Sequence, residues 1–201
     1  MDTKASEDLA HIKEMMERSS RFISLSGLSG IGAGIVGLAA GGIASSIIAN
    51  SGGKIDNYFY AEAAIPKLFG LGIIALLLAL FFGCFFTIRK SKKLGLPIWT
   101  SNTKKILIQL AIPLFTGGIF VLALLNHQLY GLIAGTTLIF YGLSLINVEK
   151  QTYSDIKYLG LLEIILGCIS LFWIGKGLIF WTIGFGVLHI VYGIILYRKY
   201  R

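Results

Sequence analysis

Six stretches of predominantly apolar residues follow one another along the chain, and the charged residues are concentrated between them. A helix needs about 20 apolar residues to cross the hydrocarbon core of a bilayer, and each stretch has about this length. No segment alternates between apolar and polar residues for long enough to build a sheet. The pattern therefore predicts an all-α, polytopic membrane bundle with six transmembrane helices, at residues 22–49, 66–88, 106–125, 129–147, 156–174 and 178–197.

The connections between these stretches predict three helical hairpins. Residues 126–128 and 175–177 form connections so short that the helices on either side must be antiparallel neighbours. An aromatic residue followed by glycine recurs near the end of every second stretch, as Phe82-Gly83, Tyr141-Gly142 and Tyr192-Gly193. This recurrence favours a repeated hairpin of constant orientation, unlike the inverted repeats of many transporters. Similar apolar composition with aromatic residues at the membrane interface is the alternative explanation.

Composition and charge both indicate a membrane protein. Of the 201 residues, 55% are hydrophobic and 14% are charged, whereas about 25% of the residues of a soluble domain are charged. All Lys and Arg residues except Lys54, Lys67 and Lys176 fall on one side of the predicted membrane. Because cytoplasmic segments carry the excess of these residues, we expect both termini in the cytoplasm and a location in the bacterial cytoplasmic (inner) membrane. The net charge of +8 then faces the anionic inner leaflet of the lipid bilayer and requires no nucleic acid as a partner.

The first 21 residues are predicted to form a short amphipathic helix in the cytoplasm. Two Glu–Arg pairs with a spacing of four residues, Glu14–Arg18 and Glu17–Arg21, favour a helix there. The charged residues at 1–21 and the long apolar run that follows do not fit a cleavable signal peptide. The expected organisation is this helix at 1–21, a transmembrane domain at 22–197 and a cytoplasmic tail at 198–201.

A glycine-rich segment in the first stretch allows two interpretations. Residues 32–37 read GAGIVG and match the dinucleotide-binding pattern G-x-G-x-x-G, but that pattern needs a βαβ unit around it. The wider spacing places five glycines on one face of a helix, namely Gly27, Gly30, Gly34, Gly37 and Gly41. Small residues at this spacing let helices approach closely in lipid, so we interpret them as a helix-packing face. The sequence leaves open whether the contact forms within one chain or creates a homo-oligomer through this helix.

Two ionisable residues are predicted to lie at similar depth inside the membrane. Glu163 is seven residues, about 10 Å, from the start of the fifth helix, and His189 is eight residues, about 12 Å, from the end of the sixth. A carboxylate in a bilayer is costly, so we expect the two side chains to meet directly or through one water. Tyr141 and Tyr192 lie near the same level and are further candidates for this site. A proton-sensitive or ligand-binding site is the functional hypothesis, and a hydrogen bond that only fixes helix packing is the alternative.

Motifs of common enzyme classes are absent from the sequence. It contains no G-x-S-x-G, H-E-x-x-H or Walker pattern, and its three His residues are too scattered to predict a metal or cofactor site. Cys84 and Cys168 lie in apolar runs and are interpreted as small core residues. We therefore expect a non-enzymatic membrane protein that acts in assembly or sensing. The alternative is a small transporter or channel that uses Glu163 and His189.

Two segments carry a resemblance to a known family. Residues 12–30, IKEMMERSSRFISLSGLSG, and residues 184–197, GFGVLHIVYGIILY, resemble an uncharacterised family of small bacterial six-helix membrane proteins. The resemblance covers both ends of the chain. It implies a membrane location and a topology but no activity and no site residues.

Overall fold

The computed structural model describes residues 8–9, 26–51, 62–95, 97–149, 152 and 155–199. Within these ranges the chain is helical apart from short connections and contains no strand, which confirms the all-α class. The long helices are α2 (Gly27–Asn50), α3 (Ile65–Lys93), α4 (Ser101–Asn126), α5 (Ile133–Asn147) and α6 (Ile156–Phe172). The last three elements, which we call the final rod, are α7 (Gly177–Thr182), the π-helical η5 (Ile183–Leu188) and α8 (His189–Lys199). Single 3₁₀ turns precede α3, α5 and α7, at η1 (Glu62–Ala64), η2 (Tyr130–Leu132) and η4 (Ile174–Lys176).

Five helices in the described part of the chain are long and apolar enough to cross a membrane, which is typical of a multi-pass membrane protein. They are α2, α3, α4, the helix over Tyr130–Asn147 and the helix over Ile174–Lys199. With 17 residues, α6 is shorter than these five. The cytoplasmic helix predicted at residues 1–21 lies outside the described residues, apart from Asp8 and Leu9.

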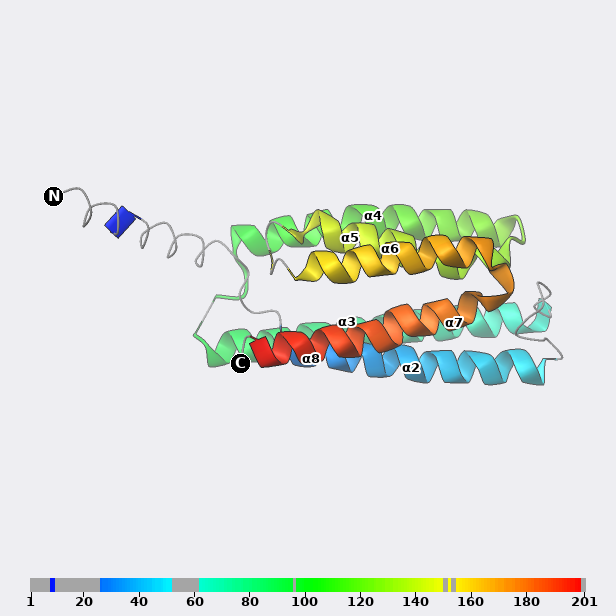
Figure 1. The fold of residues 1–201 in the computed structure, drawn as a ribbon, viewed down its shortest axis with the longest axis horizontal. Coiled ribbons are helices and arrows are strands. Elements are labelled where there is room, and N and C mark those ends of the chain that lie inside the picture. The colour runs from blue at the N-terminus through cyan, green and yellow to red at the C-terminus, as the bar shows by residue number, and fades with distance from the viewer. Residues whose placement is uncertain are drawn as a thin grey trace.

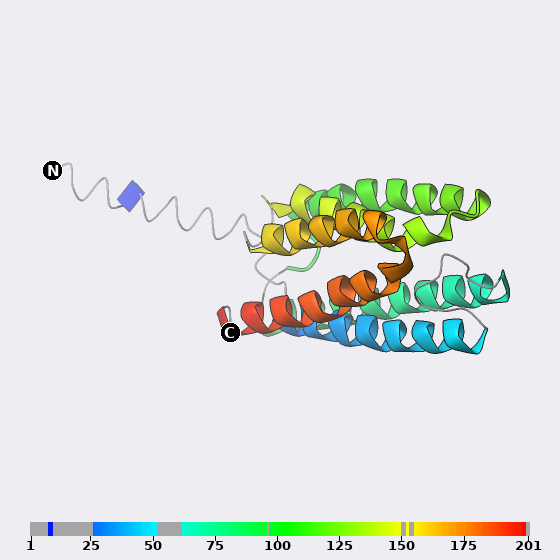
Figure 2. The ribbon, with the colours of Figure 1, turned by 45° about the vertical axis from the view of Figure 1, so that its right-hand side comes forward.

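The helices lie in two layers (Figures 1 and 2). One layer holds α4, α5 and α6, and the other holds α3, α2 and the final rod. The final rod begins at the end of α6 and runs into the other layer, so that α6 packs mainly against α5 and the final rod packs mainly against α2. Two of the three expected hairpins, α2–α3 and α4–α5, are therefore closely packed. The third, made of α6 and the final rod, is spread over both layers.

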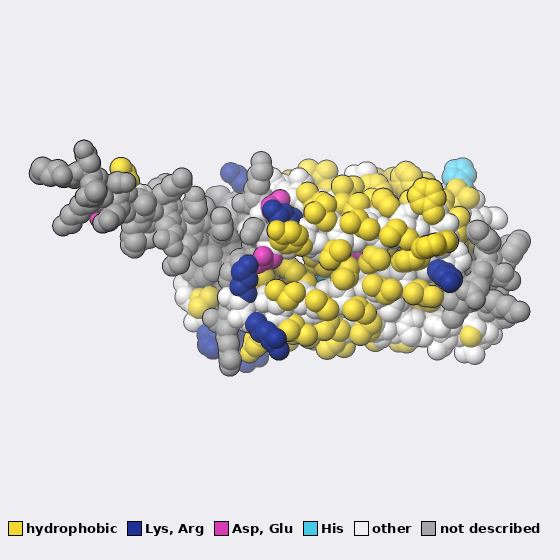
Figure 3. Space-filling model, viewed as in Figure 1, with side chains coloured by type: hydrophobic (Ala, Val, Ile, Leu, Met, Phe, Trp, Pro, Cys, Tyr) yellow, Lys and Arg dark blue, Asp and Glu magenta, His cyan; other side chains and the backbone are white. Residues whose placement is uncertain are grey.

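The outer helices present apolar side chains to the surroundings of the protein. Because α3 packs mainly against α2 and α4 mainly against α5, most of their residues are exposed. Figure 3 shows an apolar band over the middle of the molecule on the face where α6 and the final rod lie in front. Cys84 on α3 and Cys168 on α6 are both exposed, so the interpretation of these cysteines as core residues is wrong. The lipid-facing surface of a membrane protein is as apolar as its core, and an apolar sequence neighbourhood therefore does not distinguish the two.

The glycine face of α2 packs against the final rod of the same chain. A Cβ atom added to Gly34 would lie 2.7 Å from the carbonyl oxygen of Gly186 and 2.8 Å from the backbone nitrogen of Ile190. The other predicted glycines of this face, Gly27, Gly30, Gly37 and Gly41, also meet residues of the final rod. The final rod of the same chain thus covers this face.

A second pair of helices, α5 and α6, is joined in the same way. A Cβ atom on Gly142 would lie 2.5 Å from the carbonyl oxygen of Gly160, and one on Gly160 would lie 2.8 Å from that of Gly142. Gly135 and Gly167 form the corresponding contact seven residues away on each helix, at 2.8 Å in both directions. Backbone contact at these glycines explains why α6 packs against α5. The final rod packs against α2 instead of α6.

A proline inside α4 is compensated by a side chain of α5. Pro113 has no N–H group to donate to the carbonyl of Gln109, four residues earlier in the helix. The Asn147 side-chain amide donates to this carbonyl at 2.8 Å. In a membrane every backbone polar group needs such a partner, so Pro113 here links α4 to α5 without leaving a free acceptor.

Gly34→Leu should disrupt the contact between α2 and the final rod. The new side chain has no space against the backbone of Gly186, and overpacking of this kind costs about 1–3 kcal/mol or more. Thermal unfolding of the purified protein in detergent measures the effect. Gly42→Leu on the same helix is the matched control, because an added Cβ atom there meets nothing within 4 Å. Equal midpoints for both variants would contradict the packing role of the glycine face.

Candidate functional site

The predicted polar residues Glu163, His189 and Tyr141 come together where the two layers meet. Glu163 lies on the buried face of α6 and is 0% exposed. His189 is the first residue of α8 in the final rod and is also buried, while Tyr141 lies on α5. One side chain thus comes from the final rod and two come from the other layer.

A chain of short contacts connects these three residues. The Tyr141 hydroxyl lies 2.8 Å from Nε2 of His189, and Nδ1 of His189 lies 3.0 Å from the carbonyl oxygen of Gly184. The same Nδ1 atom is 3.4 Å from Oε1 of Glu163. Because a carbonyl oxygen can only accept, the hydrogen bond to Gly184 requires the proton on Nδ1. In the neutral imidazole, Nε2 then accepts from Tyr141, and Nδ1–H faces both the Gly184 carbonyl and the carboxyl group.

The π-helical segment and its glycine make room for the carboxyl group of Glu163. A Cβ atom on Gly184 would collide with Oε2 of Glu163 and would lie 2.5 Å from Cδ2 of Leu138. Gly184 therefore cannot carry a side chain while Glu163 keeps its position. The segment ends immediately before His189, and π-helical turns of this kind often occur at functional sites.

Glu163 has no hydrogen bond to either carboxyl oxygen from any of the described residues. An uncompensated carboxylate at a buried position costs several kcal/mol, so the group is either protonated or paired with a protonated His189. The approach of Nδ1 to 3.4 Å makes the imidazole the partner for the second state. The pair therefore has two positions for one proton, the carboxyl group of Glu163 and Nε2 of His189, since Nδ1 already carries a proton.

Aromatic rings surround His189 on the side of the final rod and α5. The ring of Phe185 lies 5.9 Å from that of His189 and 5.1 Å from that of Tyr141. Trp181 in turn lies 5.0 Å from Phe185. These rings keep the environment of the imidazole apolar, so that the hydroxyl of Tyr141 is its one side-chain hydrogen-bonding partner among the described residues.

The fourth predicted residue, Tyr192, lies one turn further along α8. It is partly buried and packs against the apolar cluster of Ile106, Leu145, Val148, Ile156 and Leu159. The structure thus groups Tyr192 with the core beside the site. No group of three or more His, Cys, Asp or Glu residues that could hold a metal ion occurs within the described ranges.

No family model matches this chain. No curated protein and no solved structure matches it either. The family resemblance of residues 12–30 and 184–197 therefore stays a prediction. The functional interpretation rests on the geometry of the chain itself.

Sequence reasoning missed the backbone contribution to this site. The position of the Gly184 carbonyl, and the close approach of Gly184 to Glu163 and Leu138, depend on a π-helical segment, which a regular helical periodicity does not reveal. The glycine at 184, five residues before a histidine inside an apolar stretch, is the local signal that could have indicated it.

Tyr141→Phe should destabilise the site while preserving its shape. Without the hydroxyl, Nε2 of His189 loses the hydrogen bond at 2.8 Å, and a buried acceptor left without a partner costs about 1–3 kcal/mol. Thermal unfolding in detergent measures the loss of stability in the variant. In the unchanged protein, the ¹⁵N chemical shifts of His189 should show that Nδ1 carries the proton of the neutral ring. Tyr158→Phe on exposed Tyr158 is the control and should leave both measurements unchanged. A neutral Nε2–H tautomer would contradict the described hydrogen-bond pattern.

Proposed function

We propose that the chain is a six-span protein of the bacterial cytoplasmic membrane with both termini in the cytoplasm. The 17 residues of α6 span about 25 Å, which is close to the hydrocarbon thickness of about 30 Å. An even number of spans agrees with Figure 1, in which α2 begins and α8 ends at the same end of the molecule.

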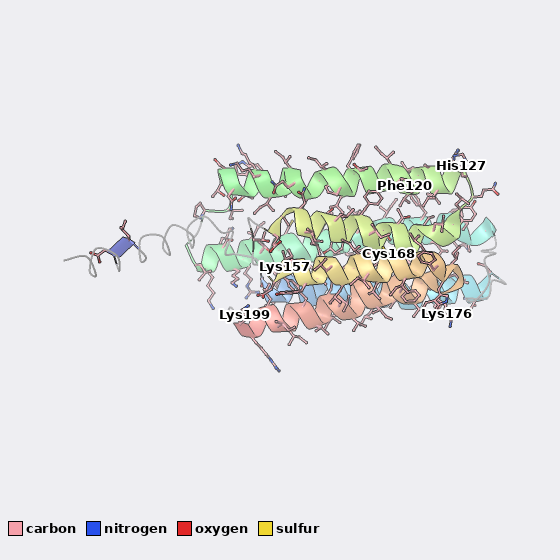
Figure 4. The ribbon with its side chains drawn as sticks, turned by 45° about the horizontal axis from the view of Figure 1, so that its top comes forward. Phe120, His127, Lys157, Cys168, Lys176 and Lys199 are labelled. Atoms are coloured by element: carbon pink, nitrogen blue, oxygen red, sulfur yellow. The ribbon has the colours of Figure 1, made fainter. Side chains whose placement is uncertain are left out.

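The distribution of charge supports this orientation (Figures 3 and 4). Lys157 and Lys199 lie at one end of the molecule, and Lys176 lies at the other (Figure 4). We call the first the basic end, because nearly all described Lys and Arg residues belong to helix ends located there: Arg89, Lys90, Lys92, Lys93, Lys104, Lys105, Lys157, Arg198 and Lys199. A cytoplasmic location of the basic end follows from the excess of positive charge on the inner side of membranes.

Reporter fusions should test this topology. A reporter inserted after Lys93 or fused to the C-terminus should be active in the cytoplasm. Reporters inserted at His127 or Lys176 should be active on the opposite side of the membrane, because these residues lie at the opposite end (Figure 4). A C-terminal reporter that is active outside the cytoplasm would exclude the six-span arrangement.

We further propose that this membrane protein is non-enzymatic and senses protons through Glu163. The observation that carries the proposal is a fully buried carboxyl group that an imidazole nitrogen approaches to 3.4 Å. Ionisable residues inside a membrane are costly, and they often serve in proton relays and ion pathways. Tyr141 is a further ionisable group in contact with the pair, and Tyr192 packs against the apolar cluster beside it.

The charge of the pair couples its protonation to the contact between the layers. With one proton, the pair is either a neutral acid beside a neutral imidazole or an ion pair, and neither state leaves an uncompensated charge. Loss of that proton leaves a carboxylate beside a neutral imidazole. The resulting negative charge lies between α6 and the final rod, where few other contacts join these helices. Deprotonation should therefore weaken this interface, which is the response of a proton sensor.

Glu163→Gln should remove a pH-dependent signal without unfolding the protein. Infrared difference spectra of the protein in liposomes should show the C=O stretch of a buried carboxylic acid, which grows as the pH falls. The glutamine keeps the size of Glu163 and an oxygen that faces Nδ1 of His189, so the fold should persist, but it cannot bind the proton. Glu149→Gln, at the partly exposed end of α5, is the control and should retain the signal. Identical spectra for the parent protein and Glu163→Gln would refute proton binding at this residue.

A proton-coupled transporter or channel is the second candidate. The observation that favours it is the π-helical segment that interrupts the final rod beside Glu163, between two layers of helices. Transporters place their binding sites at interrupted helices between bundles that move relative to each other. Proteoliposomes distinguish the two candidates: a transporter dissipates an imposed pH gradient only while Glu163 is present, whereas a sensor leaves the gradient intact.

A further inference from the structure

An ion pair joins the two layers at the basic end. The Lys199 ammonium group, in the last turn of α8, donates to Oδ1 of Asp155 at 2.9 Å and to Oδ2 at 2.8 Å. Asp155 immediately precedes α6, so the pair connects the final rod to the layer of α4, α5 and α6. The Asp155 side chain is 19% exposed and that of Lys199 is 51% exposed, which places the pair at the edge of the interface.

Asp155 and Glu163 lie on the same face of α6. Residues 155, 159 and 163 follow one another at intervals of four, so Leu159 lies between the two acidic residues and is buried. The distance from Asp155 to Glu163 along the helix is about 12 Å. The ion pair is therefore about two helical turns from the proton-binding site.

The facing side of α8 carries the three partners in the corresponding order. Lys199, Tyr192 and His189 are separated by seven and three residues, which places them on one helical face. Tyr192 packs against the apolar cluster that contains Leu159. From the basic end inward, α8 thus carries an ion pair to Asp155, a tyrosine packed on the apolar cluster, and the histidine that faces Glu163.

We propose that the Asp155–Lys199 ion pair and the packing of Tyr192 against the apolar cluster that contains Leu159 form a gate that controls the access of water and protons from the basic end to Glu163. The inference rests on the proposed proton binding at Glu163. At the opposite end the short turn η4 connects α6 covalently to the final rod. The basic end is therefore where these two helices can separate. The ion pair holds them together there, and the apolar contact excludes water beneath it.

Thiol labelling measures the opening of this gate. The parent protein is Glu163→Cys in the full chain with Cys84→Ser and Cys168→Ser, which keeps every residue of the gate, reconstituted into liposomes with a charged methanethiosulfonate on both sides of the membrane. Lys199→Gln and Asp155→Asn should each increase the labelling rate of the cysteine at position 163 about threefold, the size expected for the loss of a partly exposed ion pair. Lys199→Arg should retain the slow rate, because guanidinium binds a carboxylate through two hydrogen bonds.

Lys157→Gln is the matched control for charge removal. Lys157 pairs with Glu149 at 3.4 Å within a single layer, so its loss should leave the labelling rate unchanged. Equal rates for Lys199→Gln, Asp155→Asn and the parent would overturn the gate. Labelling of this cysteine does not require proton binding, because the cysteine takes the place of Glu163. A failed gate therefore leaves the infrared signal of Glu163 intact, whereas failed proton binding removes that signal and leaves the labelling rates as expected.

Discussion

In lipid, helices gain little by burying apolar side chains against one another, so the close approach of backbones at glycines decides which helices pair in this protein. The contacts between α5 and α6 and between α2 and the final rod both have this origin. Each of these helices packs mainly against the neighbour whose backbone its glycines contact. As a result α6 and the final rod, although consecutive in sequence, belong to different layers and share only a narrow contact. Glu163 occupies that contact, and its environment follows from the pairing of the glycines.

The two glycine contacts have the same geometry. On α5, Gly135 and Gly142 meet Gly167 and Gly160, and on the final rod, Gly186 and Gly193 meet α2 near Gly37 and Gly30. In both cases the second helix of one hairpin packs on the first helix of another, through glycines seven residues apart. This correspondence gives a physical cause for the recurring glycines of the fourth and sixth stretches, Gly142 and Gly193, which make contacts between hairpins. Gly83, the recurring glycine of the second stretch, makes no such contact, since a Cβ atom added to Gly83, Gly70 or Gly72 of α3 meets nothing within 4 Å.

Local patterns in the sequence predicted the features that depend on a single helix, which are its position in the chain and the face through which it packs. The apolar stretches predicted where helices occur, and the spacing of Gly27, Gly30 and Gly34 predicted that α2 has a packing face. The partner of that face depends on three-dimensional complementarity, which a spacing of three and four residues does not encode. The shared depth of Glu163 and His189 followed from helical rise, because both lie at fixed distances from helix ends. The π-helical segment was not predictable in this way, since it departs from the regular rise and brings the Gly184 carbonyl to His189.

The position of Glu163 between two layers also determines what the residue can respond to. A carboxyl group confined within α5 and α6 would be fixed by their glycine contacts, and its charge would mainly affect stability. Here the imidazole that faces Glu163 belongs to the final rod. Glycine contacts hold the final rod to α2, and both lie in the layer that does not contain α6. Under the proposed role, a change in the charge of the pair acts across the junction of the two layers, where α6 and the final rod share few contacts, and not within the closely packed pair of α5 and α6.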